Sequence, residues 1–142
     1  MNIVEQAAKA LDQLHIDSYE ADGNSIIYRP NNPDGFMIML SPNGQGGYTV
    51  SYEGWHEEFE KEEEALRCFL FGLSKTCRLR VHARGKKAYK WAVEQYVNQN
   101  WHIDSITGLL FFPFWRRSVI TYHSNGVIDW PVSDERKGVT DA

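Results

Sequence analysis

The sequence predicts an α+β protein in which two helices pack on a predominantly antiparallel, twisted sheet of about seven or eight strands. Two segments carry apolar residues at helical spacing, and most of the remaining chain alternates apolar and polar residues between turn-forming sequences. Aromatic residues make up 13% of the chain, which favours strands. We expect the order α-β-β-β-α-β-β-β-β-β, with the strands in one sheet or in two subsheets.

The first helix is expected at the N-terminus and should end near His15. Asn2 can cap it, and Glu5 stands where the acid of a capping box belongs. The apolar residues recur at helical intervals, which places them on one face. These residues are Ile3, Val4, Ala7, Ala8, Leu11 and Leu14.

A second helix is expected over residues 61–74. Glutamates at 62–64 begin it and Lys75 follows it, and this charge order suits the helix dipole. His56 and Glu58 could supply metal ligands, but the cluster of glutamates at 57, 58, 60 and 62–64 is interpreted as a solvated acidic entry to the helix instead. The apolar stripe consists of Ala65, Leu66, Phe69, Leu70 and Leu73.

Between the two helices, residues 25–29, 36–40 and 48–52 are short, strand-like and separated by turn-forming sequences, which predicts a three-stranded meander. After the second helix, residues 78–84 alternate strictly and predict a strand with two different sides. Leu79, Val81 and Ala83 form the apolar side, and Arg78, Arg80, His82 and Arg84 form the basic side.

Further strands are expected at residues 88–97, 101–106, 109–115, 118–123 and 127–130. The pair Asn125-Gly126 predicts a hairpin between the last two. The stretch G-L-L-F-F-P-F-W-R-R at 108–117 is apolar on both sides, but Pro113 cannot donate a ladder hydrogen bond. We therefore expect residues 109–112 inside the protein and a bend near the surface that carries Phe114, Trp115, Arg116 and Arg117.

The length of 142 residues fits a single domain, expected over residues 1–130 and followed by a polar, flexible tail at 131–142. Cys68 and Cys77 are in no paired motif and are expected to be free thiols. The chain opens without a basic and apolar leader, and no apolar run approaches the roughly 20 residues that span a bilayer. These features predict a soluble, cytoplasmic protein with no membrane partner.

Charge is distributed unevenly along the chain. Residues 1–64 contain 13 acidic and 3 basic residues, whereas residues 65–142 contain 6 acidic and 12 basic residues. Acidic and basic elements could face each other or be solvated on different sides, and the alternative is two distinct binding faces. The overall pI of about 5.7 argues against a large phosphate-binding surface.

Few residues suggest catalysis or metal binding. His102 and Asp104 lie two positions apart, so on a strand they share a face, and the carboxylate could orient the imidazole. No nucleophile motif and no HExxH or paired-cysteine spacing accompanies them. The sequence therefore predicts no catalytic residue, no metal site and no cofactor, and it does not define the oligomeric state.

The leading hypothesis is a non-enzymatic module that binds another protein, because Trp and Arg are the residues that most often anchor interfaces. The residues match no named family motif. In its acidic composition and its many aromatic residues the chain resembles small bacterial immunity proteins that bind toxin nucleases, which implies an immunity-type or regulatory partner of another bacterial protein. The expected binding residues are Trp55, Arg78, Arg80, His82, Arg84, Phe114, Trp115, Arg116 and Arg117.

Two alternatives remain open. The first is a small hydrolase or ligand-binding α+β domain that uses His102 and Asp104 in a pocket between sheet and helices. The second is RNA binding through the basic side of residues 78–84, with Tyr96 or Trp101 as a stacking surface.

Overall fold

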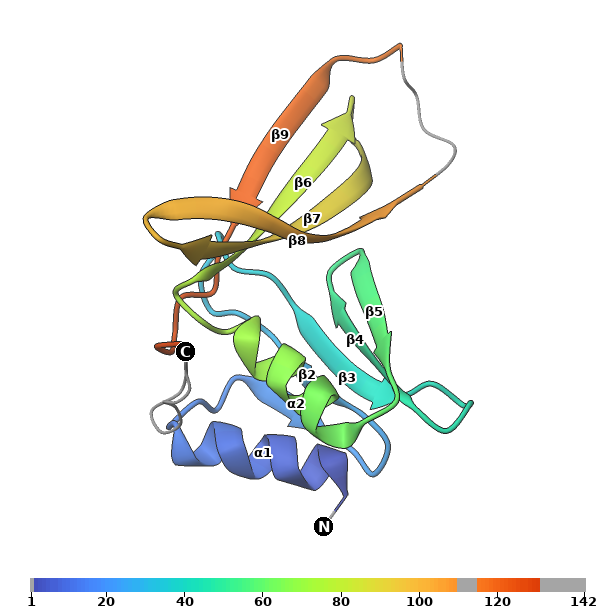
Figure 1. Cartoon of the computed structure of the whole chain (residues 1–142), viewed down its shortest axis with the longest axis vertical. Helices are drawn as coiled ribbons and strands as arrows, with labels where there is room; N and C mark the ends of the chain where they lie inside the picture. Colours follow the sequence, from blue (N-terminus) through green and yellow to red (C-terminus); the bar gives the residue numbers. More distant parts are fainter. Residues whose placement is uncertain (1, 110–114, 131–142) are drawn as a thin grey trace.

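The computed structural model describes residues 2–109 and 115–130. Within these residues the chain forms two helices and two separate antiparallel sheets, of five and four strands. The predicted α+β class is confirmed. The predicted strand count and order are not matched, because five strands precede the second helix and four described strands follow it. Two subsheets were one of the two expected arrangements, and each half of the chain builds a sheet of its own (Figure 1).

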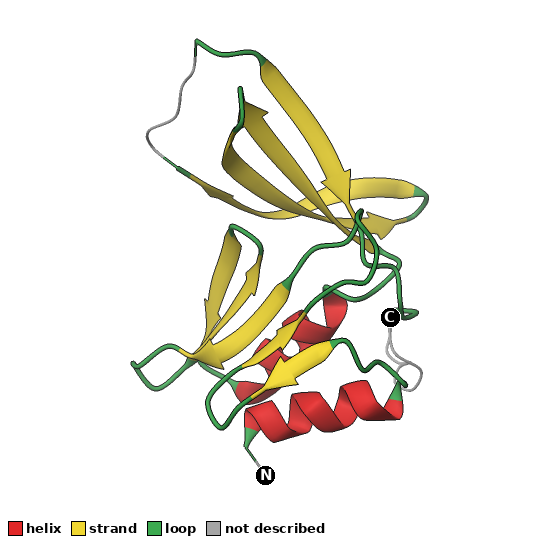
Figure 2. Ribbon diagram, turned by 180° about the vertical axis from the view of Figure 1, so that it is seen from behind, coloured by secondary structure: helices red, strands yellow, loops and turns green. Residues whose placement is uncertain are grey.

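The first layer combines the two helices with the first sheet. Helix α1 spans Ile3–Gln13 and helix α2 spans Glu62–Phe71. The first sheet is a simple meander in the order β1-β2-β3-β4-β5, and both helices lie on one of its faces (Figure 2). Its strands are β1 (Tyr19–Ala21), β2 (Ile26–Tyr28), β3 (Ile38–Pro42), β4 (Tyr48–Tyr52) and β5 (Trp55–Phe59).

Helix α1 begins as the sequence predicts. The side chain of Asn2 accepts a hydrogen bond from the backbone N–H of Glu5, and the carboxylate of Glu5 accepts one from the backbone N–H of Asn2, at 2.8 and 2.9 Å. This capping box satisfies two N–H groups that the first turn of a helix leaves without partners. The helix buries Ile3, Val4, Ala7 and Leu11 against the sheet and α2.

The sequence predicts no strand at residues 55–59, and this is wrong, although His56, Glu57 and Glu58 are solvent-exposed as expected. These residues form strand β5, which pairs with β4 from Tyr52↔Trp55 to Tyr48↔Phe59. Trp55 at its start is buried and the three residues that follow are exposed. Exposed acidic residues concealed the strand, since period-two alternation is absent from the segment.

The second sheet follows α2 and has the order β8-β7-β6-β9. Its strands are β6 (Cys77–Arg84), β7 (Lys87–Val97), β8 (Asn100–Gly108) and β9 (Ser118–His123). Asn98 and Gln99 connect β7 and β8 with φ values of 53° and 68°, the left-handed conformation that a tight two-residue hairpin requires. In Figure 1 this sheet stands above the first layer, and β9 lies at its free edge.

The predicted hairpin at residues 125–126 is also wrong. Gly126 has the positive φ of 60° that a turn can use, but residues 127–130 form no strand beside β9. Instead the chain returns to the first layer, where Ile128 makes an isolated parallel bridge with Ser74. Asn125 is buried there. Its amide oxygen accepts a hydrogen bond from the backbone N–H of Phe36 and its amide nitrogen donates to the carbonyl of Gly72, both at 2.9 Å.

The two layers touch along β5, β7 and β8. Trp55 Nε1 donates a hydrogen bond to Ser105 Oγ at 3.2 Å, and the indole of Trp91 lies directly against Gly54, where no Cβ could fit. Leu79 and Val93 of the second sheet belong to the same hydrophobic core as α1, α2 and the first sheet. The second sheet is therefore anchored to the first layer through one of its faces.

Two predictions fall outside the described residues. The expected strand at 109–115 includes residues 110–114, and the expected tail occupies 131–142. Leu109, which was expected inside the protein, is described and is 42% exposed, so that expectation is wrong for this residue. By contrast, the predicted strand at 118–123 is confirmed with the same bounds as β9.

Candidate functional site

The pairing register defines two faces of the second sheet, because directly opposed residues of an antiparallel pair point to the same side. One face carries Leu79 and Val93 and is buried against the first layer. We call the opposite one the outer face. It consists of Arg78, Arg80, His82 and Arg84 on β6, Lys90, Ala92, Glu94 and Tyr96 on β7, Trp101, Ile103 and Ile106 on β8, and Ile120 and Tyr122 on β9.

The rim of the outer face is apolar and exposed. Ile103 and Ile106 on β8 are 50% and 52% exposed, and Ile120 and Tyr122 on β9 are 48% and 49% exposed. Within the described residues, every exposed large apolar side chain except Val127 lies between positions 96 and 122. Exposed large apolar side chains gathered on one part of a domain surface are typical of interaction sites.

The floor of the outer face is closed. Ala92 is fully buried but does not belong to the core that joins the two layers, and Glu94 beside it is also buried. The long side chains of the basic residues on β6 extend over this floor. We use the word trough for this floor together with the exposed apolar side chains, or rims, of the opposite edge strands β8 and β9.

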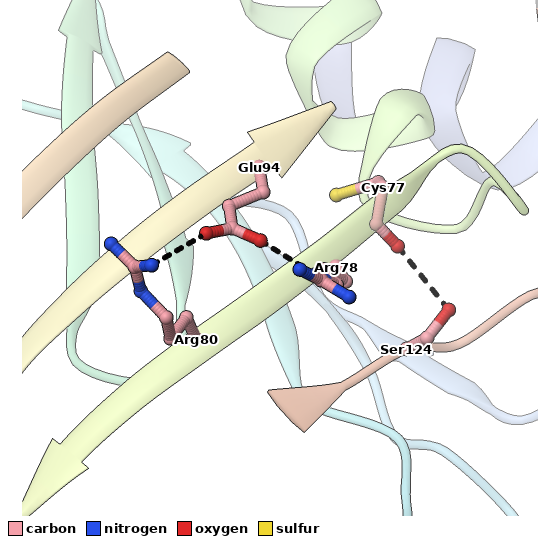
Figure 3. Close-up of polar contacts among 5 residues, drawn as sticks. All are labelled: Cys77, Arg78, Arg80, Glu94 and Ser124. Atoms are coloured by element: carbon pink, nitrogen blue, oxygen red, sulfur yellow. Dashed lines mark hydrogen bonds and ion pairs between the residues drawn. The ribbon is translucent and has the colours of Figure 1, made fainter. Parts of the chain in front are cut away.

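Glu94 holds two of the four basic residues on β6 (Figure 3). Its Oε1 lies 2.5 Å from Nε of Arg78, and its Oε2 lies 3.1 Å from Nη1 of Arg80. The carboxylate side chain is 4% exposed, so these charge-assisted hydrogen bonds form largely out of water. The cationic side predicted at residues 78–84 is consequently neutralised in part.

Arg78 also joins the two rims. Its guanidinium carbon lies 4.3 Å from the ring centre of Trp101 on β8 and 4.3 Å from that of Tyr122 on β9. Each ring presents its electron-rich face to the cation, an arrangement that contributes about 0.5 to 2 kcal/mol per contact. Since β8 and β9 are the two edges of the sheet, the sandwich shows that the sheet curls around the outer face.

Three nitrogen atoms within the trough have no hydrogen-bond partner among the described residues. They are Nε of Arg80, Nε2 of His82 and Nε of Arg84, all buried. Burial lowers the pKa of His82, and the neighbouring charges of Lys90 and Arg80 lower it further. At neutral pH the imidazole is therefore uncharged, and the charge of this part of the trough comes from arginine and lysine.

The trough ends in a basic cluster at the β6–β7 turn. Arg84, Lys86, Lys87 and Arg116 line a hollow of about 380 Å³. The described residues provide no ion pair to any of these four side chains. Arg84 instead donates to the backbone carbonyl of Arg116 at 3.4 Å. This end of the trough thus carries cationic charge that no described acidic side chain neutralises.

A second hollow, of about 330 Å³, lies between the two layers. Its charged and amide-bearing lining residues are Glu57, Glu64, Arg67, Gln95 and Asp104, and most of its other lining residues are aromatic, Trp130 among them. Asp104 reaches it because β8 bulges at this position, which leaves Asp104 without a partner in the β7–β8 register. Burial raises the pKa of Glu57, and the nearby charge of Asp104 adds to this effect.

His102 and Asp104, the pair considered for acid-base chemistry, are placed differently, because Asp104 lines the hollow and His102 does not. His102 is exposed and does not line the hollow, and no hydrogen bond joins it to Asp104 in the described part of the chain. Among the described residues, no group of three or more His, Cys, Asp or Glu side chains is placed to hold a metal ion. The described helices are also too short or too polar to cross a membrane.

The residues expected to bind a partner are distributed as follows. Arg78, Arg80, His82 and Arg84 lie on the outer face, and Trp115, Arg116 and Arg117 are exposed beyond its basic end. Trp115 is 72% exposed. Phe114 lies outside the described residues. Trp55 is 1% exposed inside the core, so it supports the second sheet from below and is not part of the outer face.

Sequence reasoning did not single out Glu94 or the apolar rim residues Ile103, Ile106, Ile120 and Tyr122. A signal for the rim existed, because Ile120 and Tyr122 alternate with Thr121 and follow the period of a strand. What the sequence could not supply is the pairing between β6 and β9, which brings Tyr122 opposite Arg80.

No protein-family model, curated protein or solved structure matches the chain.

Proposed function

We propose that this protein is a non-enzymatic module that binds another protein through the outer face of its second sheet. The observation that carries the proposal is the exposed apolar rim, with four side chains near half exposure on the two edge strands. Aromatic residues and arginine, which are enriched at interfaces, accompany it in the form of Tyr122, Trp101 and the arginines of β6.

The charge of the trough indicates the chemistry of the partner. Glu94 offsets part of the charge of Arg78 and Arg80, whereas Arg84 and the turn residues Lys86 and Lys87 keep theirs. A complementary partner carries apolar side chains for the rim and acidic side chains for the basic end. An inhibitor or regulator of another bacterial protein, of the immunity type, is the role that fits such a module.

RNA binding receives less support from the same surface. Protein surfaces that bind nucleic acid are more polar and more basic than those that bind protein. Three of the four rim side chains are isoleucines, which offer neither charge nor a stacking plane to a base. The aromatic ring of Tyr122 already stacks on Arg78 within the protein.

The proposal is tested by comparing two substitutions of similar chemistry. Ile106→Lys places a charge on the rim, and Val127→Lys changes a residue of similar exposure that lies outside the outer face. Tagged protein of each kind is used to capture partners from the native lysate, the captured protein is identified by mass spectrometry, and its affinity is measured with purified components.

We expect Ile106→Lys to weaken binding at least about tenfold, which corresponds to about 1.4 kcal/mol, and Val127→Lys to leave it unchanged. The free energy of unfolding of each variant should lie within about 0.5 kcal/mol of that of the original protein, because both positions are exposed. Equal affinity of the two variants for the same partner would contradict the proposal. Recovery of nuclease-sensitive RNA in place of a protein would favour the RNA alternative.

A further inference from the structure

We infer that the partner adds an extended strand to the free edge of β9, antiparallel to it, with acidic residues at the C-terminal end of the added strand. This inference rests on the proposed protein-binding function and specifies how the partner is held. It follows from the edges of the two sheets, from the direction of the β9 backbone groups and from the charge beside them.

Three of the four sheet edges are protected, in the way that soluble proteins commonly block unwanted strand pairing. Strand β1 is only three residues long. The backbone of β5 is covered by the second sheet, since Thr107 Oγ1 both accepts from the N–H and donates to the carbonyl of His56. Strand β8 is interrupted by its bulge and carries the charged Asp104 at that point.

Within the described residues, strand β9 has none of these protections. Its sequence S-V-I-T-Y-H contains no charged residue other than a histidine at its end and no proline. Its register with β6 continues without a shift over six pairs, whereas both other ladders of the second sheet are irregular at one point. All of its residues except His123 are exposed, so side chains on both faces of the strand are accessible.

The backbone of β9 offers hydrogen-bonding groups at this edge. The N–H of Gly85 donates to the carbonyl of Arg117 at 3.0 Å, in register with the β6–β9 ladder. Because bonded and non-bonded pairs alternate in an antiparallel ladder, Val119 and Thr121 bond to β6. Ser118, Ile120 and Tyr122 then direct their N–H and C=O groups away from β6, and no hydrogen bond between described residues reaches them from that side.

Charge sets the polarity of the added strand. Arg116 and Arg117 immediately precede β9 and are exposed, and they continue the basic cluster at the β6–β7 turn. The opposite end of β9 leads to His123 and the buried Asn125, and the exposed cation described near it, Lys75, is paired with Asp129 at 3.2 Å. In an antiparallel arrangement the C-terminal end of the added strand lies beside Arg116 and Arg117, so acidic residues belong there.

The test uses a synthetic peptide of three Val-Thr repeats followed by three aspartates, with both ends blocked. A control peptide carries the aspartates before the repeats. Binding to the isotope-labelled full chain is followed by NMR titration and by the exchange rates of individual backbone amides. Ile120→Pro removes an N–H at the free edge, and Ile120→Ala is its matched control, because it removes the same side chain but keeps that N–H. Proline with an outward nitrogen is tolerated on an edge strand.

We expect saturating peptide to slow hydrogen exchange of the Ile120 and Tyr122 backbone amides at least tenfold. The exchange rates of the Val119 and Thr121 amides should change little. The control peptide should bind several-fold more weakly, and Ile120→Pro should weaken binding at least tenfold more than Ile120→Ala. If Ile120→Pro does not fold, as judged by its unfolding curve, Ser118→Pro removes a second outward N–H and serves in its place.

Three results would overturn the inference. The first is a failure of the binding comparison. This means that Ile120→Pro and Ile120→Ala bind the peptide equally well, that the two peptides bind equally well, or that neither peptide binds at millimolar concentration. The second is unchanged exchange of Ile120 and Tyr122. The third is slow exchange of these amides that grows with protein concentration in the absence of peptide, because this identifies a second copy of the chain as the occupant. In each case the effect of Ile106→Lys on the captured partner still decides the proposed function separately.

Discussion

Arg78 and Glu94 face each other directly across β6 and β7, with Nε of the arginine 2.5 Å from Oε1 of the carboxylate. The same carboxylate reaches Arg80, so a single acidic side chain organises the floor of the outer face. Removal of one member of a buried ion pair leaves a charge without compensation, and this is more costly than loss of an exposed pair. The stability of the second sheet should depend on this residue.

Glu94→Gln is expected to lower the free energy of unfolding by about 2 kcal/mol, a value below that of fully buried pairs because both arginines are partly exposed. Urea unfolding followed by fluorescence measures the change. Glu20→Gln is the control, since its ion pair with Arg29 is exposed and should contribute about 0.5 kcal/mol or less. Similar losses for the two variants would contradict the central role of Glu94.

Asn125→Ala is expected to destabilise the protein by about 3 kcal/mol, because it leaves the buried N–H of Phe36 and the carbonyl of Gly72 without partners. Thermal unfolding of the variant gives the value. Asn100→Ala removes one exposed side-chain hydrogen bond at 3.3 Å and should have a small effect. If Asn125→Ala were equally mild, the return of the chain to the first layer would not depend on this side chain.

Gly54→Ala tests the contact between the two layers. A Cβ at position 54 would collide with the indole of Trp91, and overpacking of this kind costs about 1 to 3 kcal/mol. Gly23→Ala is the matched control, because a Cβ there meets no atom within 4 Å and the backbone has no positive φ. Equilibrium unfolding should separate the two variants by more than about 1 kcal/mol. Equal stability would mean that the layers do not pack as described.

The two thiols are expected to be unreactive in the folded protein. Burial raises the pKa of Cys68 to about 12, and burial also raises the pKa of Cys77 well above its usual value. Because the thiolate is the nucleophile, iodoacetamide at pH 8 should label both residues on the order of a hundredfold more slowly than in unfolded protein. Mass spectrometry of labelled peptides measures each rate, and rapid labelling of either thiol in folded protein would contradict their burial.

The same pKa shifts predict a loss of stability at alkaline pH. A thiol whose pKa is higher in the folded state stays protonated there at pH values at which it has already ionised in the unfolded state. Ionisation therefore favours the unfolded state as the pH rises. For Cys68 the free energy of unfolding should be constant below about pH 9 and should fall between pH 9 and about 12. Cys68→Ala should flatten this part of the pH profile. An unchanged slope in the variant would assign the effect to other groups, such as buried Tyr52.

Much of the fold could be predicted from local patterns. The capping box of Asn2 and Glu5, the stripe of α2 and the alternation of β6 all express short-range chemistry, and each is confirmed. Strand β5 was missed because its exposed acidic residues do not alternate with apolar ones. The hairpin at Asn125-Gly126 was wrong because the amide of Asn125 makes tertiary hydrogen bonds that no local pattern reveals.

The candidate site was less accessible to sequence reasoning. The basic residues of β6 were recognised, but the carboxylate that holds them belongs to the next strand, and its position depends on a register with a bulge. The rim required the pairing of β6 with β9, which brings together residues far apart in the chain. Local alternation identifies which residues share a side of one strand, and only the tertiary arrangement shows which strands lie beside each other.

That pairing has a consequence for the way the chain acquires its shape. Every other ladder between the described strands joins neighbours in the sequence, whereas β6 and β9 are separated by two strands and by the segment that follows β8. Contacts between distant positions form slowly, because the intervening loop must first lose entropy. During synthesis on the ribosome, one edge of β6 therefore stays unpaired until residues 118–123 emerge. An unpaired strand edge is prone to aggregation, so the nascent chain most needs protection in this period.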